Sequence, residues 1–243
     1  MTAAGRIAAL TGLSAAGWRE LRGAYPLLPA AAGPRAAARR VLLARLAARR
    51  LRTGRWAARI DGDPPGPDDG PTVFVSAHLG SLQALRYTLR ARGIRAANVL
   101  GPHNVHRPDA ERQDRIFDAV HPLDFPHFFP ASAVHRVRSA LRKGSLVLAA
   151  DLPLPGQGVA VPLLGGRAFV DPRPFRLARA AGVPCRPAFL TLPRGRWTLT
   201  IGPVLPRDEA GAVAAFARCQ AEVAARSPLD LDGPVYLRRA RDG

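Results

Sequence analysis

His78 is the residue whose type and position best suit it for chemistry. It lies in the segment 72–85, which reads TVFVSAHLGSLQAL. The small and β-branched residues before it predict a buried strand, and the apolar-periodic stretch after it predicts a helix. Open α/β sheets place their chemistry at such strand-to-helix junctions, where an imidazole can act as a general base. Five residues later, where a carboxylate could hold that imidazole, the chain has Gln83.

Other catalytic signatures are missing from the sequence. It contains no G-x-S-x-G elbow, no Walker A loop and no G-x-G-x-x-G, so serine-hydrolase and phosphate-loop chemistry are not indicated. A group of five histidines makes a metal site an alternative, and its members are His103, His106, His121, His127 and His135. The close pair, His103 and His106, lies in a proline-flanked loop without a carboxylate or cysteine ligand spaced beside it. We therefore expect no metal.

Elements that would position His78 alternate along the chain from residue 72 onward. The predicted strands are 72–77, 96–100, 145–150, 159–164, 184–192 and 197–201. The predicted helices are 81–92, 108–120, 132–143, 174–181 and 208–226. This alternation predicts an α/β fold with a mixed, largely parallel central sheet flanked by helices.

A stretch rich in proline, glycine and aspartate, residues 61–71, predicts a connector. It divides the chain into an N-terminal helical segment, residues 1–60, and an α/β domain, residues 72–243. Leucines at three- and four-residue spacing in the range 35–59 predict an amphipathic helix whose remaining surface is basic.

The charge of the chain is strongly positive. There are 36 basic and 18 acidic residues, and twelve arginines but one glutamate fall in the first 60 residues. Such a patch implies an anionic partner. A basic amphipathic helix can lie on an anionic membrane surface, and an ordinary solvated surface helix is the alternative. Low aromatic content, at 6%, and the lack of a base-reading module argue against nucleic acid.

Cysteine usage and hydropathy point to the cytoplasm. Cys185 and Cys219 form no close-spaced motif, and no apolar run approaches the roughly 18 residues that span a bilayer. Arginines interrupt the apolar stretches near the N-terminus, so a signal peptide is not indicated. We expect a cytoplasmic protein, peripheral on the inner face of the cell membrane.

Three blocks of the chain resemble the lysophospholipid acyltransferase superfamily, and most closely its bacterial lipid A biosynthesis (lauroyl/myristoyl-type) branch. They are FVSAHLGSLQAL, LRKGSLVLAADLPLPGQGVAVPLLGGRAFV and FRLARAAGVPCRPAFL, and together they cover roughly residues 70–205. Their order and spacing carry the resemblance.

The resemblance implies transfer of a fatty acyl group from a thioester, on acyl carrier protein or coenzyme A, to a hydroxyl of a lipid or glycolipid. No further cofactor is implied. His78 matches the family's base, which would take the proton of the attacking hydroxyl. In the family an acidic residue follows the histidine by five positions, and Gln83 stands there in this chain. The amide oxygen of Gln83 can orient the imidazole but cannot offset its positive charge.

Several further residues are candidates for the site. Asp151 follows an apolar predicted strand, so its carboxylate is expected at the sheet edge, as a catalytic group or as a turn cap. An arginine that the family uses for anionic substrate groups is replaced by Gly101, with Asn104 retained and Arg107 further along the loop. Four further residues are candidates for substrate binding. Gly80 and Ser81 follow the histidine, and Gly165 and Arg167 belong to a glycine-containing turn. An ordinary hairpin is the alternative explanation of that turn.

Two functions remain open from the sequence. The first is a membrane-surface O-acyltransferase with His78 as base, supported by Gln83 or Asp151. The second is a catalytically weak or inactive homologue that binds acyl carriers or lipid as a partner. An acyltransferase for a soluble metabolite is a third alternative.

Overall fold

The structure is a computed structural model, and it describes residues 3–29, 33–52, 59–62, 69–100, 128–130, 134–154, 156–193 and 196–242. Its N-terminal helices are α1 (Ala3–Thr11), α2 (Ala15–Ala24) and α3 (Pro34–Arg52). The other helices are α4 (Leu82–Arg90), α6 (Val134–Ala140), α7 (Arg173–Ala181), α8 (Glu209–Arg226), the 3₁₀ turn η3 (Pro228–Asp230) and α9 (Gly233–Asp242). The strands are β1 (Arg59–Gly62), β2 (Val73–Ser76), β3 (Ala96–Leu100), β4 (Phe128–Pro130), β5 (Ser145–Ala149), β6 (Val159–Leu163), β7 (Gly166–Val170), β8 (Cys185–Thr191) and β9 (Thr198–Ile201).

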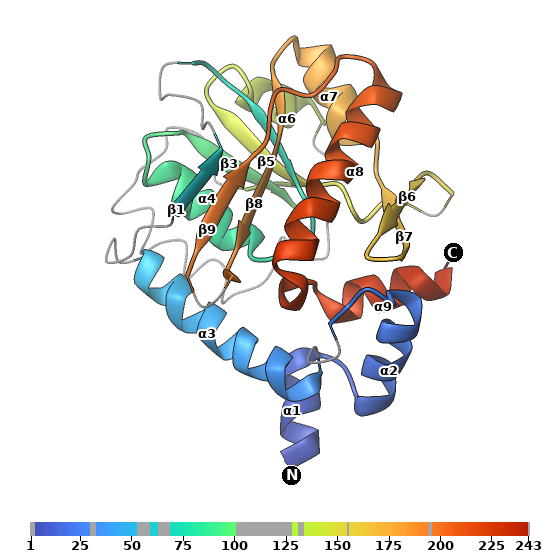
Figure 1. Cartoon of the computed structure of the whole chain (residues 1–243). Helices are drawn as coiled ribbons and strands as arrows, with labels where there is room; N and C mark the ends of the chain where they lie inside the picture. Colours follow the sequence, from blue (N-terminus) through green and yellow to red (C-terminus); the bar gives the residue numbers. More distant parts are fainter. Residues whose placement is uncertain are drawn as a thin grey trace.

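A central sheet organises the fold (Figure 1). Within the described ranges, seven strands form it in the order β1-β9-β8-β2-β5-β3-β4. Strands β2, β3, β4, β5 and β8 run parallel, while β8 and β9 pair antiparallel. This arrangement confirms the predicted mixed, largely parallel sheet flanked by helices.

Helices cover both faces of the sheet. Side chains alternate along β2, so Phe74 packs with α4 on one face while Val73 and Val75 join the core on the other. That second core contains residues of α6, α7 and α8, including Phe175 and Phe216. All four residues of β2 are buried, as expected for a parallel strand with a helical layer on each side.

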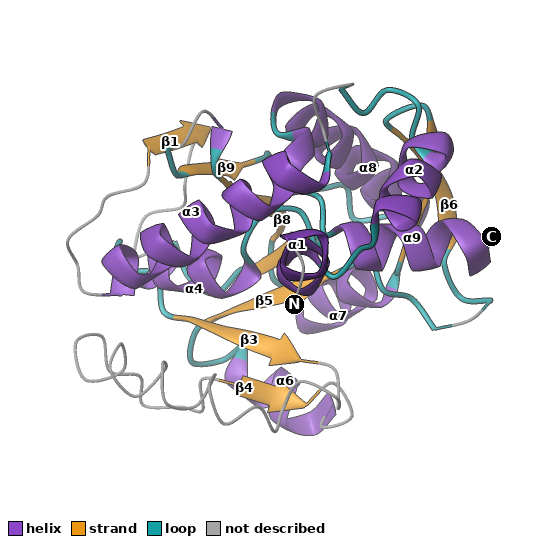
Figure 2. Ribbon diagram, turned by 90° about the horizontal axis from the view of Figure 1, so that it is seen from below, coloured by secondary structure: helices purple, strands orange, loops and turns teal. Residues whose placement is uncertain are grey.

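The N-terminal and C-terminal helices meet below the sheet. Figure 1 shows α1, α2, α3 and α9 gathered at the bottom of the molecule. Trp18, Leu21 and Tyr25 from α2 and its C-terminal end are buried in the same core as Tyr236 and Leu237 of α9. Helix α3 lies across this side of the molecule (Figure 2) and contacts α1, α4 and η3. None of the helices in the described ranges is both long and apolar enough to cross a bilayer.

Several predicted elements differ from the structure. The predicted connector begins inside β1, because Asp61 and Gly62 pair with Thr200 and Ile201 of β9. The predicted strand 159–164 is confirmed as β6, and it pairs with β7 in a separate antiparallel hairpin outside the central sheet. Strands β1, β4 and β7 and helix α9 were not among the predicted elements. The predicted helix 108–120 lies outside the described residues, and the division into residues 1–60, 61–71 and 72–243 stays a prediction.

Candidate active site

The register of two neighbouring strands brings His78 and Asp151 together. Strands β2 and β5 pair in parallel, with Val73 opposite Leu146 and Ser76 opposite Ala149. The pairing continues past the strands, because the Ala150 N–H donates to the Ser76 carbonyl oxygen at 2.8 Å. With the same offset of 73 residues, His78 lies beside Asp151. Both therefore leave the sheet at its carboxyl edge, where open α/β sheets bind ligands.

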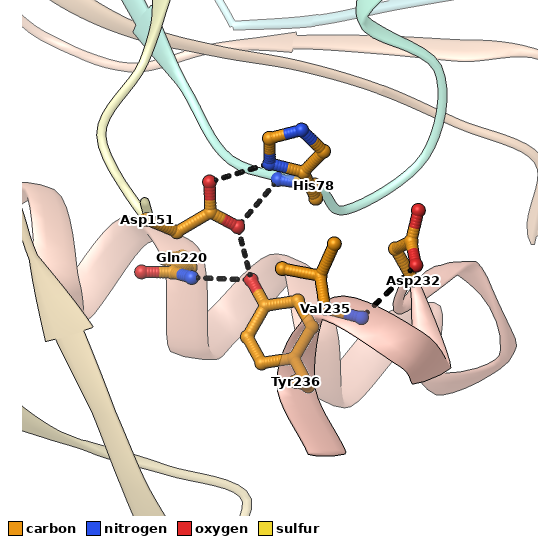
Figure 3. A network of polar contacts seen from close by, with 6 residues as sticks. All are labelled: His78, Asp151, Gln220, Asp232, Val235 and Tyr236. Atoms are coloured by element: carbon orange, nitrogen blue, oxygen red, sulfur yellow. Dashed lines mark hydrogen bonds and ion pairs between the residues drawn. The ribbon is translucent and has the colours of Figure 1, made fainter. Parts of the chain in front are cut away.

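Asp151 contacts His78 at two points (Figure 3). The carboxylate oxygen Oδ1 lies 2.8 Å from the imidazole Nδ1, and Oδ2 accepts the backbone N–H of His78 at 2.6 Å. The Asp151 side chain is buried at 2% exposure, while the His78 side chain keeps 21%. The carboxylate is thus fixed within the protein, and the imidazole reaches the surface.

This geometry sets the tautomer of the imidazole. An ionised carboxylate only accepts hydrogen bonds, so the proton of a neutral His78 ring resides on Nδ1. The second nitrogen, Nε2, then carries the lone pair, and Figure 3 shows it on the side of the ring away from Asp151. A histidine held in this way can accept a proton at Nε2 and spread the resulting charge toward the carboxylate.

Behind Asp151 lies a second layer of buried polar groups. The Tyr236 hydroxyl donates to Oδ2 of Asp151 at 3.0 Å, and Nε2 of Gln220 donates to the Tyr236 oxygen at 2.8 Å (Figure 3). Burial first, and the nearby negative charge of Asp151 second, hold the pKa of Tyr236 well above its usual value of 10. The phenol is therefore a neutral donor over the physiological pH range.

The turn after His78 requires a glycine. Gly80 has φ +85°, and a Cβ there would collide with the carbonyl oxygen of Leu190 at the end of β8. The Gly80 N–H donates to the Asp230 carbonyl oxygen at 2.8 Å. Ser81 caps α4, because its hydroxyl accepts the Ala84 N–H at 3.1 Å, and its own N–H donates to Leu190. The structure thus gives Gly80 and Ser81 contacts that shape the loop, and their predicted contact with substrate stays a prediction.

The segment that follows α8 holds this loop in place. Leu79 forms an antiparallel bridge with Leu231, and the Asp232 N–H donates to the His78 carbonyl oxygen at 2.9 Å. The carboxylate of Asp230 accepts the Leu192 N–H at 2.8 Å, which ties the same segment to the end of β8. His78 is therefore supported on one side by Asp151 and on the other by residues 230–232.

The predicted residues Gly165 and Arg167 belong to the β6–β7 hairpin. Leu164 and Gly165 both have positive φ, at 48° and 77°, as a two-residue hairpin turn of the primed type requires. The turn packs on the end of α2 and the residues after it, since the Leu27 N–H donates to the Leu164 carbonyl oxygen at 3.0 Å. The guanidinium of Arg167 lies over the Phe169 ring, 5.4 Å from its centroid. An ordinary hairpin accounts for this turn, and a contact with substrate stays a prediction.

Other predicted site residues lie outside the described part of the chain. The backbone of Gln83 is in the first turn of α4, but its side chain is not described. Gly101, Asn104 and Arg107 also lie outside the described residues, as do all of the clustered histidines except His135, which is exposed. Among the residues that the structure describes, no group of three or more histidine, cysteine, aspartate or glutamate side chains is placed to hold a metal.

Sequence reasoning missed Tyr236 and Gln220. Gln220 interrupts the buried face of α8 between Phe216 and Val223, so a polar residue at a core position was the available signal. Tyr236 lies in a short C-terminal helix, and no spacing in the sequence connects it with residue 151.

A pocket of about 220 Å³ lies between β8, β9 and the C-terminal end of α8. Its lining is mixed and includes Thr191, Thr198, Thr200 and Arg226. His78 is not among the residues that line it. The pocket therefore does not define the space in which a substrate would meet the imidazole.

The fold and the site define a mixed α/β protein with a histidine–aspartate pair at the carboxyl edge of its sheet. No protein-family model matches the chain, and no curated protein matches it. Among solved structures, the chain is similar to the 1-acyl-sn-glycerophosphate (LPA) acyltransferase PlsC from Thermotoga maritima. The sequence identity is 15% and the TM-score 0.43, over 79% of this chain and 80% of that chain. A likeness this distant carries no argument, so the fold rests on the strand pairings above and the function on the site.

Proposed function

We propose that this protein is an O-acyltransferase that moves a fatty acyl group from a thioester donor to a hydroxyl of a lipid or glycolipid, with His78 as the general base. The observation that carries the proposal is the contact between His78 Nδ1 and Asp151 Oδ1 at 2.8 Å. This contact supports the proposal because it favours an imidazole with its proton on Nδ1 and a lone pair on Nε2. The histidine also lies in the sequence block that resembles the acyltransferase superfamily.

The chemistry requires a base because an alcohol is a poor nucleophile. Nε2 of His78 accepts the hydroxyl proton as the acceptor oxygen attacks the thioester carbonyl carbon. The tetrahedral intermediate then collapses, the carbon–sulfur bond breaks, and the proton passes from the imidazolium to the departing thiolate. The carboxylate of Asp151 stabilises the imidazolium between these two steps.

In this proposal Asp151 stabilises the imidazolium, which the resemblance implies an acidic residue at position 83 would do. Gln83 carries no charge, so it cannot stabilise an imidazolium as a carboxylate does. Asp151 has that charge and already contacts Nδ1. The glutamine is therefore compatible with an active enzyme.

Helix α3 supports a membrane-surface location for the reaction. Leu42, Leu43 and Leu46 are exposed at 52%, 39% and 51%, on a helix that carries many arginines. Exposed leucines on an arginine-rich helix suit the interface of an anionic membrane. In this proposal the protein is cytoplasmic and peripheral on the inner face of the cell membrane. Coenzyme A or acyl carrier protein brings the acyl group, and Asn104 and Arg107 meet anionic groups of the acceptor.

A thiol-release assay tests the reaction. The purified protein is incubated with long-chain acyl-CoA or acyl carrier protein and a panel of lipid and glycolipid acceptors, and free thiol and acylated product are both measured. We expect acceptor-dependent turnover that His78→Ala abolishes, while the matched control His135→Ala, at an exposed histidine, retains it. We expect Gln83→Glu to stay within about twofold of the wild type, because one carboxylate already serves the imidazole.

Other results distinguish the alternatives. No turnover by the wild type, with turnover gained in Gln83→Glu, would identify a degenerate homologue that lacks its acid. Turnover with soluble hydroxyl acceptors but with no lipid would move the substrate class to soluble metabolites.

A further inference from the structure

We propose that Tyr236 is a positioning residue for the catalytic pair, and that its hydroxyl holds Asp151 so that one carboxylate oxygen faces the imidazole of His78. The inference rests on the proposed function, because it assigns Tyr236 a part in that same site. It concerns a residue of α9, in a part of the chain outside the three blocks that carry the sequence resemblance.

The direction of each hydrogen bond in the network follows from its chemistry. The carboxylate of Asp151 only accepts, so the Tyr236 hydroxyl must donate its single proton to Oδ2. The phenolic oxygen then has only lone pairs to offer Gln220, and the amide group that faces it must be the NH₂. The chain of donors therefore runs from Gln220 through Tyr236 to Asp151, and it ends opposite the Nδ1–H of His78.

The two carboxylate oxygens of Asp151 have different partners in this network. Oδ2 accepts both the His78 backbone N–H and the Tyr236 hydroxyl, at 2.6 Å and 3.0 Å. Oδ1 faces the ring nitrogen at 2.8 Å. Two donors on one oxygen fix the rotation of the carboxylate about its Cβ–Cγ bond. They also draw negative charge away from the oxygen that faces the imidazole.

Burial makes the hydroxyl hard to replace. Tyr236 and Gln220 are each 1% exposed and Asp151 is 2% exposed, so water does not readily reach Oδ2 if the hydroxyl is removed. A buried acceptor that loses a donor retains its desolvation cost. The raised pKa of Tyr236 keeps its proton in place throughout the pH range in which a histidine titrates.

A purely structural part for Tyr236 is the competing explanation, since its ring packs edge-on against Tyr25 with centroids 5.9 Å apart. Tyr236→Phe keeps that ring and removes only the hydroxyl. Tyr25→Phe is the matched control, because the Tyr25 hydroxyl lies 3.1 Å and 3.5 Å from the carbonyl oxygens of Arg167 and Tyr236. It feels the charge of Asp151 but makes no hydrogen bond to that carboxylate.

The test is a ¹⁵N NMR titration of the imidazole in the full chain labelled at histidine, with the His78 resonance assigned from His78→Asn. With the hydroxyl gone, more of the negative charge of Asp151 acts on the imidazolium. We expect the titration midpoint of His78 to rise by about 0.5–1 pH unit in Tyr236→Phe, a roughly three- to tenfold change in proton affinity. Tyr25→Phe should leave the midpoint within about 0.2 units, since it removes no donor from Asp151.

Activity provides the second readout. We expect Tyr236→Phe to lower kcat while leaving KM for the acyl donor unchanged, and to move the acidic limb of the pH–rate profile upward with the NMR midpoint. A folded Tyr236→Phe protein whose His78 midpoint equals that of the wild type would overturn the inference. Should this variant fail to fold, 3-fluorotyrosine incorporated into the Tyr25→Phe protein makes the Tyr236 hydroxyl a stronger donor to Asp151 and keeps its ring. A His78 midpoint that then fails to fall below that of the unlabelled Tyr25→Phe protein overturns the inference equally.

The two proposals fail in different ways. If the wild type shows no turnover with any donor, the acyltransferase function is wrong, but the NMR midpoint still decides whether Tyr236 acts on His78. If turnover is present and the midpoint does not move, only the part assigned to Tyr236 is wrong.

Discussion

The carboxylate of Asp151 contacts both the main chain and the side chain of His78. It accepts the His78 backbone N–H at 2.6 Å and lies 2.8 Å from the ring Nδ1. The same carboxylate thus fixes where the loop leaves β2 and how its imidazole is turned. We therefore expect a substitution of Asp151 to affect catalysis, through the tautomer of His78, more than it affects the fold.

Asp151→Asn tests this relationship directly. Two donors, the His78 N–H and the Tyr236 hydroxyl, meet at the position of Oδ2, so the amide oxygen of an asparagine should settle there. Its NH₂ would then face Nδ1 and place the ring proton on Nε2, the nitrogen that acts as base in the proposed reaction. We expect kcat to fall by about 10³–10⁴, as the loss of the carboxylate does in serine proteases.

Steady-state kinetics with the acyl donor measures this loss, and thermal unfolding checks that the variant is folded. Asp208→Asn is the control, because Asp208 caps α8 through the Gly211 N–H in an exposed position and asparagine caps equally well. Turnover of Asp151→Asn close to that of the wild type would show that the imidazole does not depend on this carboxylate.

Gly80→Ala should be severely destabilising. An added methyl would meet the Leu190 carbonyl oxygen, in addition to the strain of φ +85°. We expect a loss of about 3–5 kcal/mol in the free energy of unfolding, measured in urea. Gly182→Ala separates the two causes, because Gly182 has φ +69° at the end of α7 with nothing within 4 Å of an added Cβ. We expect Gly182→Ala to lower the free energy of unfolding by only about 1 kcal/mol. Equal losses in the two variants would exclude a collision at Gly80 as the cause.

High pH should destabilise the protein through its buried tyrosines. Burial first, and the charge of Asp151 second, raise the pKa of Tyr25 to about 12, and the pKa of Tyr236 is also raised. In the unfolded chain both ionise near pH 10, so above that pH the folded state binds more protons and its stability falls. This stabilisation is complete below pH 10 and is lost as the pH rises toward 12.

Each tyrosine should contribute a slope of about 1.4 kcal/mol per pH unit in that window. Urea unfolding at pH 8, 10 and 11, compared between the wild type and Tyr25→Phe, measures the contribution of Tyr25. The buried thiol of Cys185, whose pKa burial raises to about 12, adds to the slope of both proteins and cancels in the comparison. An identical slope in the two proteins would contradict the prediction.

Replacing exposed leucines of α3 should weaken membrane binding. Leu42 and Leu46 are both about half exposed, and Leu42→Gln/Leu46→Gln removes much of the apolar surface that would enter the interface. We expect binding to vesicles rich in anionic lipid to fall about tenfold or more in a sedimentation assay. Val204→Gln, at an equally exposed residue after β9, is the control. Failure of the wild type to sediment with either anionic or neutral vesicles would remove the membrane proposal.

The local pattern of the sequence predicted most elements of the sheet. Most predicted elements begin and end within a few residues of their expected limits, because each is an apolar run or an apolar-periodic stretch bounded by turn or cap residues. They are β2, β3, β5, β6, β8, β9, α4, α7 and α8. The errors fall on elements that depend on partners. Strand β1 has a polar sequence and forms by pairing with β9, and β7 forms by pairing with β6 across a two-residue turn.

The sequence by itself determined that His78 stands at the end of a buried strand and that Asp151 follows another. It also placed an uncharged glutamine where the resemblance implies an acid. Only the tertiary structure decided that these two strands are neighbours, with a parallel offset that sets Asp151 against the imidazole. It alone brought Tyr236 and Gln220, from α9 and α8, behind that carboxylate. The physical reason is that periodicity and capping act over a few residues, whereas strand order and register arise from packing between segments far apart in the chain.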